Sequence, residues 1–388
     1  MLNLLSIYAG RGLQGTVIPG CAETFETGSQ ERSERSERRR FTDRHQKIRQ
    51  FRQGDVLAMP AGLTLWFYNS GEEPLITVAL LDTGNEVNQL DHTFRNFFLA
   101  GNPYTGGQTY YRQREREEEQ SPKNNIFNGF NDQILAEIFN VDIETARRLK
   151  GRDDQRGQII RAENFNVVFP YDEEEERREG ARWEANGLEE TLCTAKLRVN
   201  LDHPSGADVY NPRGGRIATL NSQKLPILSY LRLSAEKGVL YRNAIMAPHW
   251  TINAHTMIYV TRGSGRFQVV GHTGKSVFDG QVREGQMIIV PQNYVVVKRA
   301  SEDQGIEWIS FKTNDNAMTS QLAGRLSAIR ALPEEVLMNS YQISREDARN
   351  LKYRRDESRV FSPSRSSSWS PRPKTFGYAL DVIKSMME

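Results

Sequence analysis

The apolar residues of this chain fall in short runs that turn residues separate. Gly54-Asp55 precedes the run Val56–Met59, and the segment Pro60-Ala-Gly62 ends it. Gly285 precedes a second run of this kind, which Pro291 closes. Short apolar runs between glycine, proline and polar clusters are typical of strands, whereas helices need longer periodic stretches. The pattern therefore predicts a mainly β protein.

Helical spacing of apolar residues is confined to a few segments. Asp132–Phe139 and Ile143–Leu149 carry apolar residues three and four positions apart, which predicts two short helices. Residues 317–331 and 344–352 show a similar pattern late in the chain, where Ser344 is a candidate N-cap. Each half of the chain is therefore expected to end in a pair of helices.

The second half of the chain repeats the first. Three pairs of similar segments stand in the same order in both halves: Ile7–Gly12 and Ile258–Gly263, Arg52–Pro60 and Arg283–Pro291, Ala146–Lys150 and Ala348–Lys352. The separation within these pairs shortens along the chain, because the polar insertions 27–47 and 104–125 are present in the first half only. The repeat predicts two copies of one β-rich unit. Within the second copy, 217–231 is expected to hold strands and Arg262–Gly265 a turn.

Charge changes this picture little, because the net charge is only +2 although 26% of the residues are charged. Arginine outnumbers lysine by 39 to 12 and is concentrated in polar runs. Glutamates interleave with the arginines of 27–47, which favours a solvated loop over a nucleic-acid-binding arm. No apolar span is long enough for a transmembrane helix. Residues 356–388 are rich in Ser, Pro and Arg before a short apolar end, and their first part is predicted to be disordered.

A polar run at 172–182 separates the halves, and Asn186-Gly187 and Cys193 follow it. Two interpretations remain open. In the first, the loop exposes a bond to a protease, and the cysteine beyond it holds the pieces together. Alternatively, Asn-Gly is only a tight turn, which is the usual meaning of that dipeptide. A nucleophilic role for Cys193 is disfavoured, because the chain has just one other cysteine, Cys21, with which it can pair.

The segment Asn186–Cys193 resembles the processing junction of the legumin-type 11S seed storage globulins. Three further segments support the resemblance: Gly10–Cys21, Asp208–Arg216 and Pro248–His255. The resemblance covers roughly residues 1 to 360 and implies a bicupin fold, with two β-barrel (jelly-roll) units each followed by a short helical extension. Members of that family carry a signal peptide and further strands before this point, so the chain is expected to be N-terminally truncated.

The repeat and the resemblance together divide the chain into four parts. These are a first cupin unit with its helix pair (1–150), a polar linker and processing loop (151–186), a second cupin unit with its helix pair (187–355) and a divergent tail (356–388).

The resemblance also implies a function, which is storage of nitrogen and amino acids in seeds. An asparaginyl endopeptidase is expected to cut between Asn186 and Gly187, giving acidic and basic chains that a Cys21–Cys193 disulfide joins. Trimers with other globulin subunits would pair into hexamers in the protein storage vacuole, which the chain reaches through the secretory pathway. Apolar helix faces are expected to form the trimer contacts: Leu135, Ile138 and Phe139, and Leu332, Val336 and Leu337. No membrane or nucleic-acid partner is expected.

Enzymatic cupins bind a metal through a His-x-His pair, a glutamate and a later histidine, whose side chains converge inside the barrel. In the second unit only His249 falls on a ligand position, because Thr251, Thr256 and Val296 occupy the others; in the first unit Leu65 stands at the last one. No catalytic residue, metal or cofactor is therefore predicted. A metal-dependent oxidoreductase of the oxalate-degrading type is the disfavoured alternative, and near one equivalent of bound manganese or iron would restore it. A sugar- or hormone-binding cupin is a third hypothesis, which the sequence does not address.

Overall fold

The computed structural model describes residues 2–23, 25–26, 44–84, 97–101, 125–154, 156–157, 159–162, 165, 167, 193 and 195–363. The predicted tail from residue 364 onward and the Asn186-Gly187 pair lie outside the described residues. The chain divides into two compact units. One comprises Met1, Phe25–Arg44 and Asp82–Phe169, and the other comprises Leu2–Thr24, His45–Leu81 and Pro170–Glu388.

Most strands of the first half lie in two sheets, with the orders β8-β1-β6-β9 and β5-β2-β7, and β3 and β4 pair in a separate two-stranded sheet. Their bounds are β1 (Leu2–Ala9), β2 (Arg11–Val17), β5 (Ile48–Arg52), β6 (Asp55–Met59), β7 (Thr64–Asn69), β8 (Ile76–Asp82) and β9 (Arg198–Asn200). Two shorter strands are β3 (Phe25–Glu26) and β4 (Arg44–His45). The strand β9 comes from the second half of the sequence, so the first set of sheets is completed from beyond the predicted linker.

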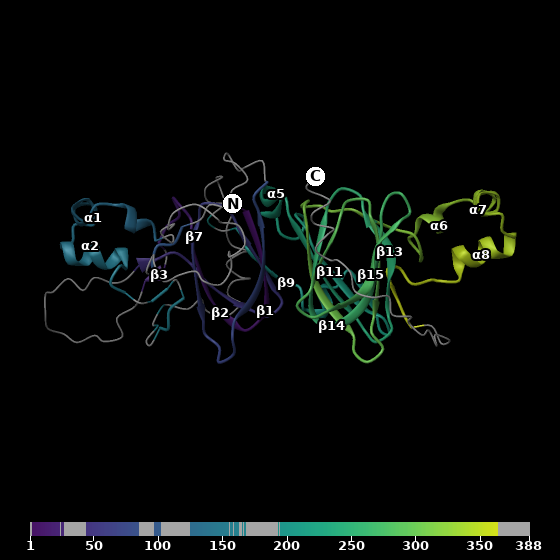
Figure 1. Ribbon diagram of the computed structural model, residues 1–388, viewed down its shortest axis with the longest axis horizontal. Coiled ribbons are helices and arrows are strands. Elements are labelled where there is room, and N and C mark those ends of the chain that lie inside the picture. The colour runs from purple at the N-terminus through teal and green to yellow at the C-terminus, as the bar shows by residue number, and fades with distance from the viewer. Residues whose placement is uncertain are drawn as a thin grey trace, which may run out of the picture. The chain divides into compact units, whose positions relative to one another are not determined.

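The strands of the second half form one sheet of 11 strands, which closes into the barrel drawn in green in Figure 1. Its path runs β10-β11-β12-β18-β14-β17-β13-β19, with β15 and β16 also paired to β14 and β20 paired to β13. The bounds are β10 (Val209–Asn211), β11 (Gly215–Leu220), β12 (Ser234–Leu240), β13 (Ile245–Thr251), β14 (Thr256–Val270), β15 (Ser276–Arg283), β16 (Met287–Val290), β17 (Val295–Ala300), β18 (Ile306–Lys312), β19 (Thr319–Gln321) and β20 (Val360–Phe361).

The turn predicted at Arg262–Gly265 is wrong, because β14 continues through it. The start of β14 pairs with β16 and β18, and its end pairs with β15 and β17. The register shifts between Val260 and Arg262, which marks a bulge where the strand changes partners. Gly263 has φ +75°, and a Cβ atom there would lie 2.0 Å from the carbonyl oxygen of Gly305. The glycine therefore serves a bulge and a close backbone approach rather than a chain reversal.

The first helix pair agrees with the sequence pattern. It consists of α1 (Asp132–Phe139) and α2 (Ile143–Lys150), preceded by the 3₁₀ helix η1 (Ile126–Gly129). The side chains of Asn131 and Asp142 accept hydrogen bonds from the first turns of α1 and α2, as N-caps do. These local signals place the helix starts at the predicted residues.

The late helices agree only in part. The segment contains α6 (Ala328–Ala331), α7 (Glu334–Tyr341) and α8 (Arg345–Tyr353), and the Ser344 side chain caps α8 by accepting from the Asp347 N–H. The helix predicted over 317–331 is confirmed only in its last four residues, which form α6, because β19 (Thr319–Gln321) forms in its first part by pairing with β13. The strands expected over 217–231 likewise end in a short helix, α5 (Leu228–Leu231), whose buried leucines pack into the core. In both cases tertiary packing overrides the local pattern.

A hydrophobic core joins strands from both halves of the sequence. Its buried members include Leu4, Val56 and Ala58 before the linker and Leu201, Ala218 and Leu220 after it. A second core fills the interior of the second barrel around Phe267 and Trp308. Burial of apolar side chains is the main stabilising contribution to such sheets.

Asp55 shows how the repeated turns differ in environment. Gly54 and Gly285 take the same left-handed conformation, with φ +85° and +81°. In the first turn the buried Asp55 carboxylate accepts hydrogen bonds from the Arg52 N–H (2.8 Å) and the Asn200 side chain (2.8 Å). In the second turn the exposed Gln286 side chain accepts from the Arg283 N–H in the same way.

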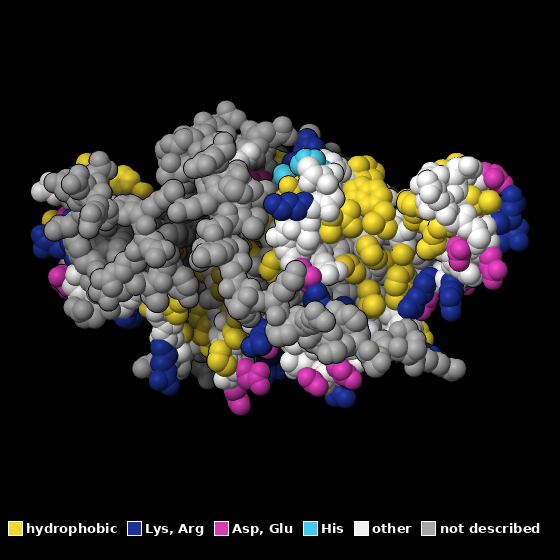
Figure 2. Space-filling model, turned by 45° about the vertical axis from the view of Figure 1, so that its right-hand side comes forward, with side chains coloured by type: hydrophobic (Ala, Val, Ile, Leu, Met, Phe, Trp, Pro, Cys, Tyr) yellow, Lys and Arg dark blue, Asp and Glu magenta, His cyan; other side chains and the backbone are white. Residues whose placement is uncertain are grey.

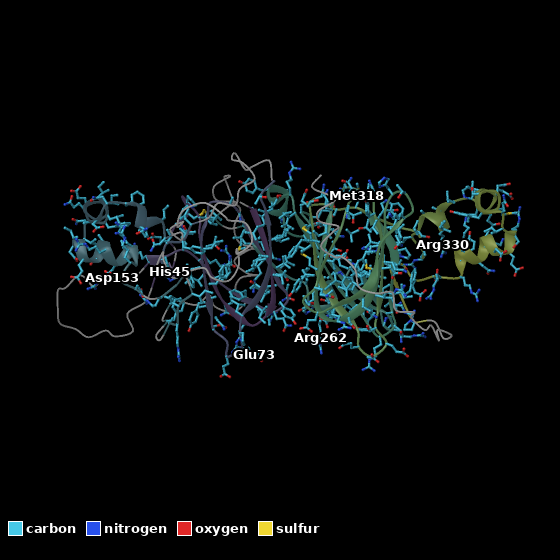
Figure 3. The ribbon with its side chains drawn as sticks, viewed as in Figure 1. His45, Glu73, Asp153, Arg262, Met318 and Arg330 are labelled. Atoms are coloured by element: carbon cyan, nitrogen blue, oxygen red, sulfur yellow. A yellow bond between two sulfur atoms is a disulfide. The ribbon has the colours of Figure 1, made fainter. Side chains whose placement is uncertain are left out.

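Replacing Asp55 by alanine is expected to lower the free energy of unfolding by about 2–4 kcal/mol. The change removes an acceptor of the Arg52 N–H and one of the two acceptors of the Asn200 side chain, which also donates to the Gln53 carbonyl. It also removes a charged partner of Arg198, which lies 3.2 Å from the carboxylate. Urea denaturation monitored by circular dichroism measures the loss. The control is Asp356→Ala, which removes an exposed partner of Arg330 (Figure 3) and should change stability little. Equal effects of the two substitutions would contradict the prediction.

Candidate functional site

The loop that carries Cys21 is held in one conformation. The Cys21 N–H donates to the Ile18 carbonyl (3.2 Å), and Gly20 has φ +82°, so Pro19-Gly20 occupies the centre of a type II turn. Gln46 clamps this turn. Its side-chain N–H₂ donates to the carbonyls of Ile18 and Cys21 (both 2.9 Å), and its side-chain oxygen accepts from the Ile18 N–H (2.8 Å).

A disulfide joins Cys21 to Cys193, with a Cα–Cα distance of 5.5 Å and a sequence separation of 172. The described residues contain no free cysteine. Asn186 and Gly187, the predicted processing site, lie outside the described residues, so cleavage there stays a prediction. A cut between them falls inside the loop that the disulfide closes.

The four positions that bind metal in cupin enzymes come together on the inner face of the second barrel. His249 on β13 pairs with Val296 on β17, and the Thr251 and Thr256 hydroxyl oxygens lie 3.3 Å apart. All four side chains are buried. The four positions that the sequence analysis compared with enzyme ligands are thus buried in the barrel, and three of them hold side chains other than the His and Glu of the enzymes.

The His249 imidazole lies close to a backbone carbonyl of its own strand and to cationic side chains. Its Nδ1 lies 2.7 Å from the Ala247 carbonyl oxygen. Burial, together with the charges of Lys298 and Arg359, lowers the pKa of His249 to about 3. Among the described residues, no group of three or more His, Cys, Asp or Glu side chains is arranged to hold a metal ion.

Beside His249 lies a group of side chains that the sequence interpretation missed, here named the cationic cluster. It consists of Glu236 (β12), Lys298 (β17), Trp308 and Lys312 (β18) and Arg359, which precedes β20. Lys312 Nζ lies 3.0 Å and Arg359 Nη2 3.4 Å from Glu236 Oε2. Burial alone would raise the pKa of the Glu236 carboxyl, but Lys312, Arg359 and Lys298 outweigh it and hold that pKa well below its usual range.

One sequence signal would have located part of this cluster. In β17, Val296, Lys298 and Ala300 alternate with more exposed residues, so Lys298 shares the inward face of the strand. A lysine between inward-facing apolar residues is rare in protein interiors, and the strand phase alone would have flagged it. Its partners are separated from it in sequence and carry no such signal.

The helix faces expected to make trimer contacts divide into two sets. Leu135 and Leu337 are almost fully buried within their own helical segments and are not available to another subunit, which corrects that part of the prediction. Ile138 is 63% exposed, and Phe139, Leu332 and Val336 also remain exposed. Apolar side chains at the surface of the second barrel and of the helices beside it are visible in Figure 2.

Comparison with known proteins accounts for this architecture. Residues 3–104 and 199–349 each match the cupin family. An 11S globulin seed storage protein of Carya illinoinensis is 50% identical over 406 residues, covering 94% of this chain and 80% of the relative. The 11S globulin subunit beta of Cucurbita maxima is also 50% identical, over 373 residues, covering 94% of this chain and 77% of the relative.

The chain belongs to the 11S seed storage globulins of the cupin family. The predicted bicupin fold and the resemblance to legumin-type globulins are confirmed. The crystal structure of pumpkin seed globulin superposes with a TM-score of 0.79 at 47% identity, covering 94% of this chain and 85% of that chain. As an 11S globulin the chain has a storage role and is not an enzyme. No helix within the described residues has the length and apolar character needed to cross a membrane.

Proposed function

We propose that this 11S globulin is a seed nitrogen store that is cut between Asn186 and Gly187 by an asparaginyl endopeptidase. The Cys21–Cys193 bond then becomes the covalent link between an acidic and a basic chain. The observation that carries this proposal is the disulfide itself, because it closes a loop that contains the predicted cleavage site. In this proposal residues 151–186 form the linker and processing loop, and residues 356–388 form a separate tail.

Assembly is the second part of the proposal. Trimers of this and related globulin subunits pair into hexamers and are stored in the protein storage vacuole, which the chain reaches through the secretory pathway. Exposed apolar residues on both helix pairs support a subunit contact: Ile134, Ile138, Phe139 and Ile143 on the first pair, and Val336 and Leu351 on the second. A structural disulfide is also compatible with the oxidising conditions of that pathway.

The experiment is treatment of the purified chain with a plant asparaginyl endopeptidase, followed by denaturing gels with and without reductant. We expect one band without reductant and two bands with it, the larger starting at Gly187. Asn186→Gln should abolish the cut, because the protease requires asparagine. The chain offers a matched control, since the same Asn-Gly dipeptide occurs at Asn128-Gly129 within η1. Asn128→Gln should leave the cut unchanged. An uncut wild-type chain would refute the cleavage proposal, and two bands without reductant would refute the disulfide link.

A further inference from the structure

The cationic cluster contains more positive than negative groups. Among the residues that the structure describes, three cations, Lys298, Lys312 and Arg359, face a single carboxylate, that of Glu236. His249, the other titratable group facing them, is neutral above its pKa of about 3. Uncompensated charge in a protein interior is costly, so buried charges are normally paired.

Lys298 is the member that has no counter-ion in contact. Its side chain is 1% exposed, and its ammonium lies 4.2 Å from the centroid of the Trp308 ring and 6.0 Å from that of Phe267. In the part of the chain that the structure describes, this ammonium donates to no carboxylate or carbonyl oxygen. The neighbouring Trp308 indole N–H is also buried without an acceptor. Two donors on neighbouring side chains, the Lys298 ammonium and the Trp308 indole N–H, therefore both lack an acceptor.

We propose that the cationic cluster binds a small inorganic monoanion of the size of chloride, held by the Lys298 ammonium and the Trp308 indole N–H. An anion supplies the missing acceptor to both donors and reduces the excess of positive charge, whereas a water molecule does only the first. A larger ligand is disfavoured, because Lys298, Trp308 and Glu236 are all 2% exposed or less and offer no surface to which it could bind from solvent.

The charge state of Lys298 sets the pH range of binding. Burial lowers the pKa of Lys298 to about 7, with Glu236 opposing this shift and Lys312 and Arg359 adding to it. The lysine is therefore increasingly neutral above about pH 7, and the affinity for an anion should fall as the pH rises through that range.

Bromide replaces chloride in such sites and is visible by anomalous diffraction. Crystals of the full chain soaked in sodium bromide are expected to show an anomalous peak within hydrogen-bonding distance of Lys298 Nζ. In solution at pH 6, the melting temperature should be a few degrees higher in sodium chloride than in sodium gluconate of equal ionic strength, because a ligand that binds the folded state stabilises it. The difference should shrink at pH 8.5.

Lys298→Met keeps the length of the side chain and removes its charge, so it should abolish the difference between chloride and gluconate. Lys275→Met, at an exposed turn, is the matched control and should retain it. A difference that persists in Lys298→Met would overturn the proposal. So would a bromide-soaked crystal in which this position shows no anomalous signal, and this second result decides the matter if Lys298→Met does not fold.

Discussion

Replacing Glu236 by glutamine is expected to lower the free energy of unfolding by about 3–5 kcal/mol. The substitution removes the one carboxylate of the cationic cluster, with Lys312 and Arg359 both in contact with it. The buried Lys312 and the partly buried Arg359 then stay beside Lys298 without the carboxylate that both contact. Because the pKa of Glu236 is lowered in the folded state, its contribution is present above its ordinary pKa of 4.5 and is lost as the pH falls below it. Urea denaturation of both proteins between pH 3 and pH 7 measures the loss and its pH dependence.

Two further variants make this test specific. Glu236→Gln combined with Lys312→Met should recover part of the stability, because the second substitution removes one of the two cations that lost their carboxylate partner. Glu335→Gln disrupts an exposed ion pair with Arg345 and should have little effect. If Glu236→Gln costs less than about 1 kcal/mol, the cations of the cluster are well solvated and the electrostatic account of the barrel interior is wrong.

Replacing both Cys21 and Cys193 by serine is expected to lower the stability of the uncut chain by about 4–5 kcal/mol. The disulfide closes a loop with a sequence separation of 172 residues, and a long loop loses much entropy when its ends are joined in the unfolded chain. The shift of the urea midpoint between wild type and the double variant measures this effect. Reductant should produce the same shift in wild type and none in the variant.

A much smaller shift would mean that the unfolded chain is already compact, so that the disulfide restricts it little. The variant Gln46→Ala distinguishes the contribution of the disulfide to stability from that of the turn that holds Cys21. This variant keeps both cysteines but loses the three hydrogen bonds that fix the Cys21 loop. It should be destabilised less than the double serine variant and should still respond to reductant.

Local signals in the sequence account for the parts of the fold that were predicted correctly. The helix Asp132–Phe139 was located to the residue from the spacing of its apolar residues, and the structure shows that Asn131 caps its start and Asn140 ends it in the left-handed conformation. The paired turns at Gly54 and Gly285 were visible because similar segments recur in the two halves, and both glycines have a positive φ in the structure. The bicupin architecture followed from this repeat and from the resemblance to legumin-type globulins.

Contacts between distant residues account for what the sequence did not reveal. The strand β19 forms because β13 is there to pair with it, and nothing within 317–331 indicates that partner. In the candidate site, Glu236 is 76 positions from Lys312 and 123 from Arg359, so the ion pairs exist only after the barrel has closed. The metal-ligand positions were found because they follow from the spacing of sequence motifs, whereas the cationic cluster depends on three strands and the segment before β20.

The pairing of β6 with β9 has a consequence for the cut protein. After cleavage between Asn186 and Gly187, β6 and β9 would belong to different polypeptides, yet Asp55 opposite Asn200 and Leu57 opposite Arg198 keep their register. The core around Leu4, Val56 and Leu220 would also draw side chains from both. The two products would thus be complementing fragments, each lacking part of a sheet and core that the other supplies. Reductant alone would break their covalent link without separating them, and their dissociation would require denaturant as well.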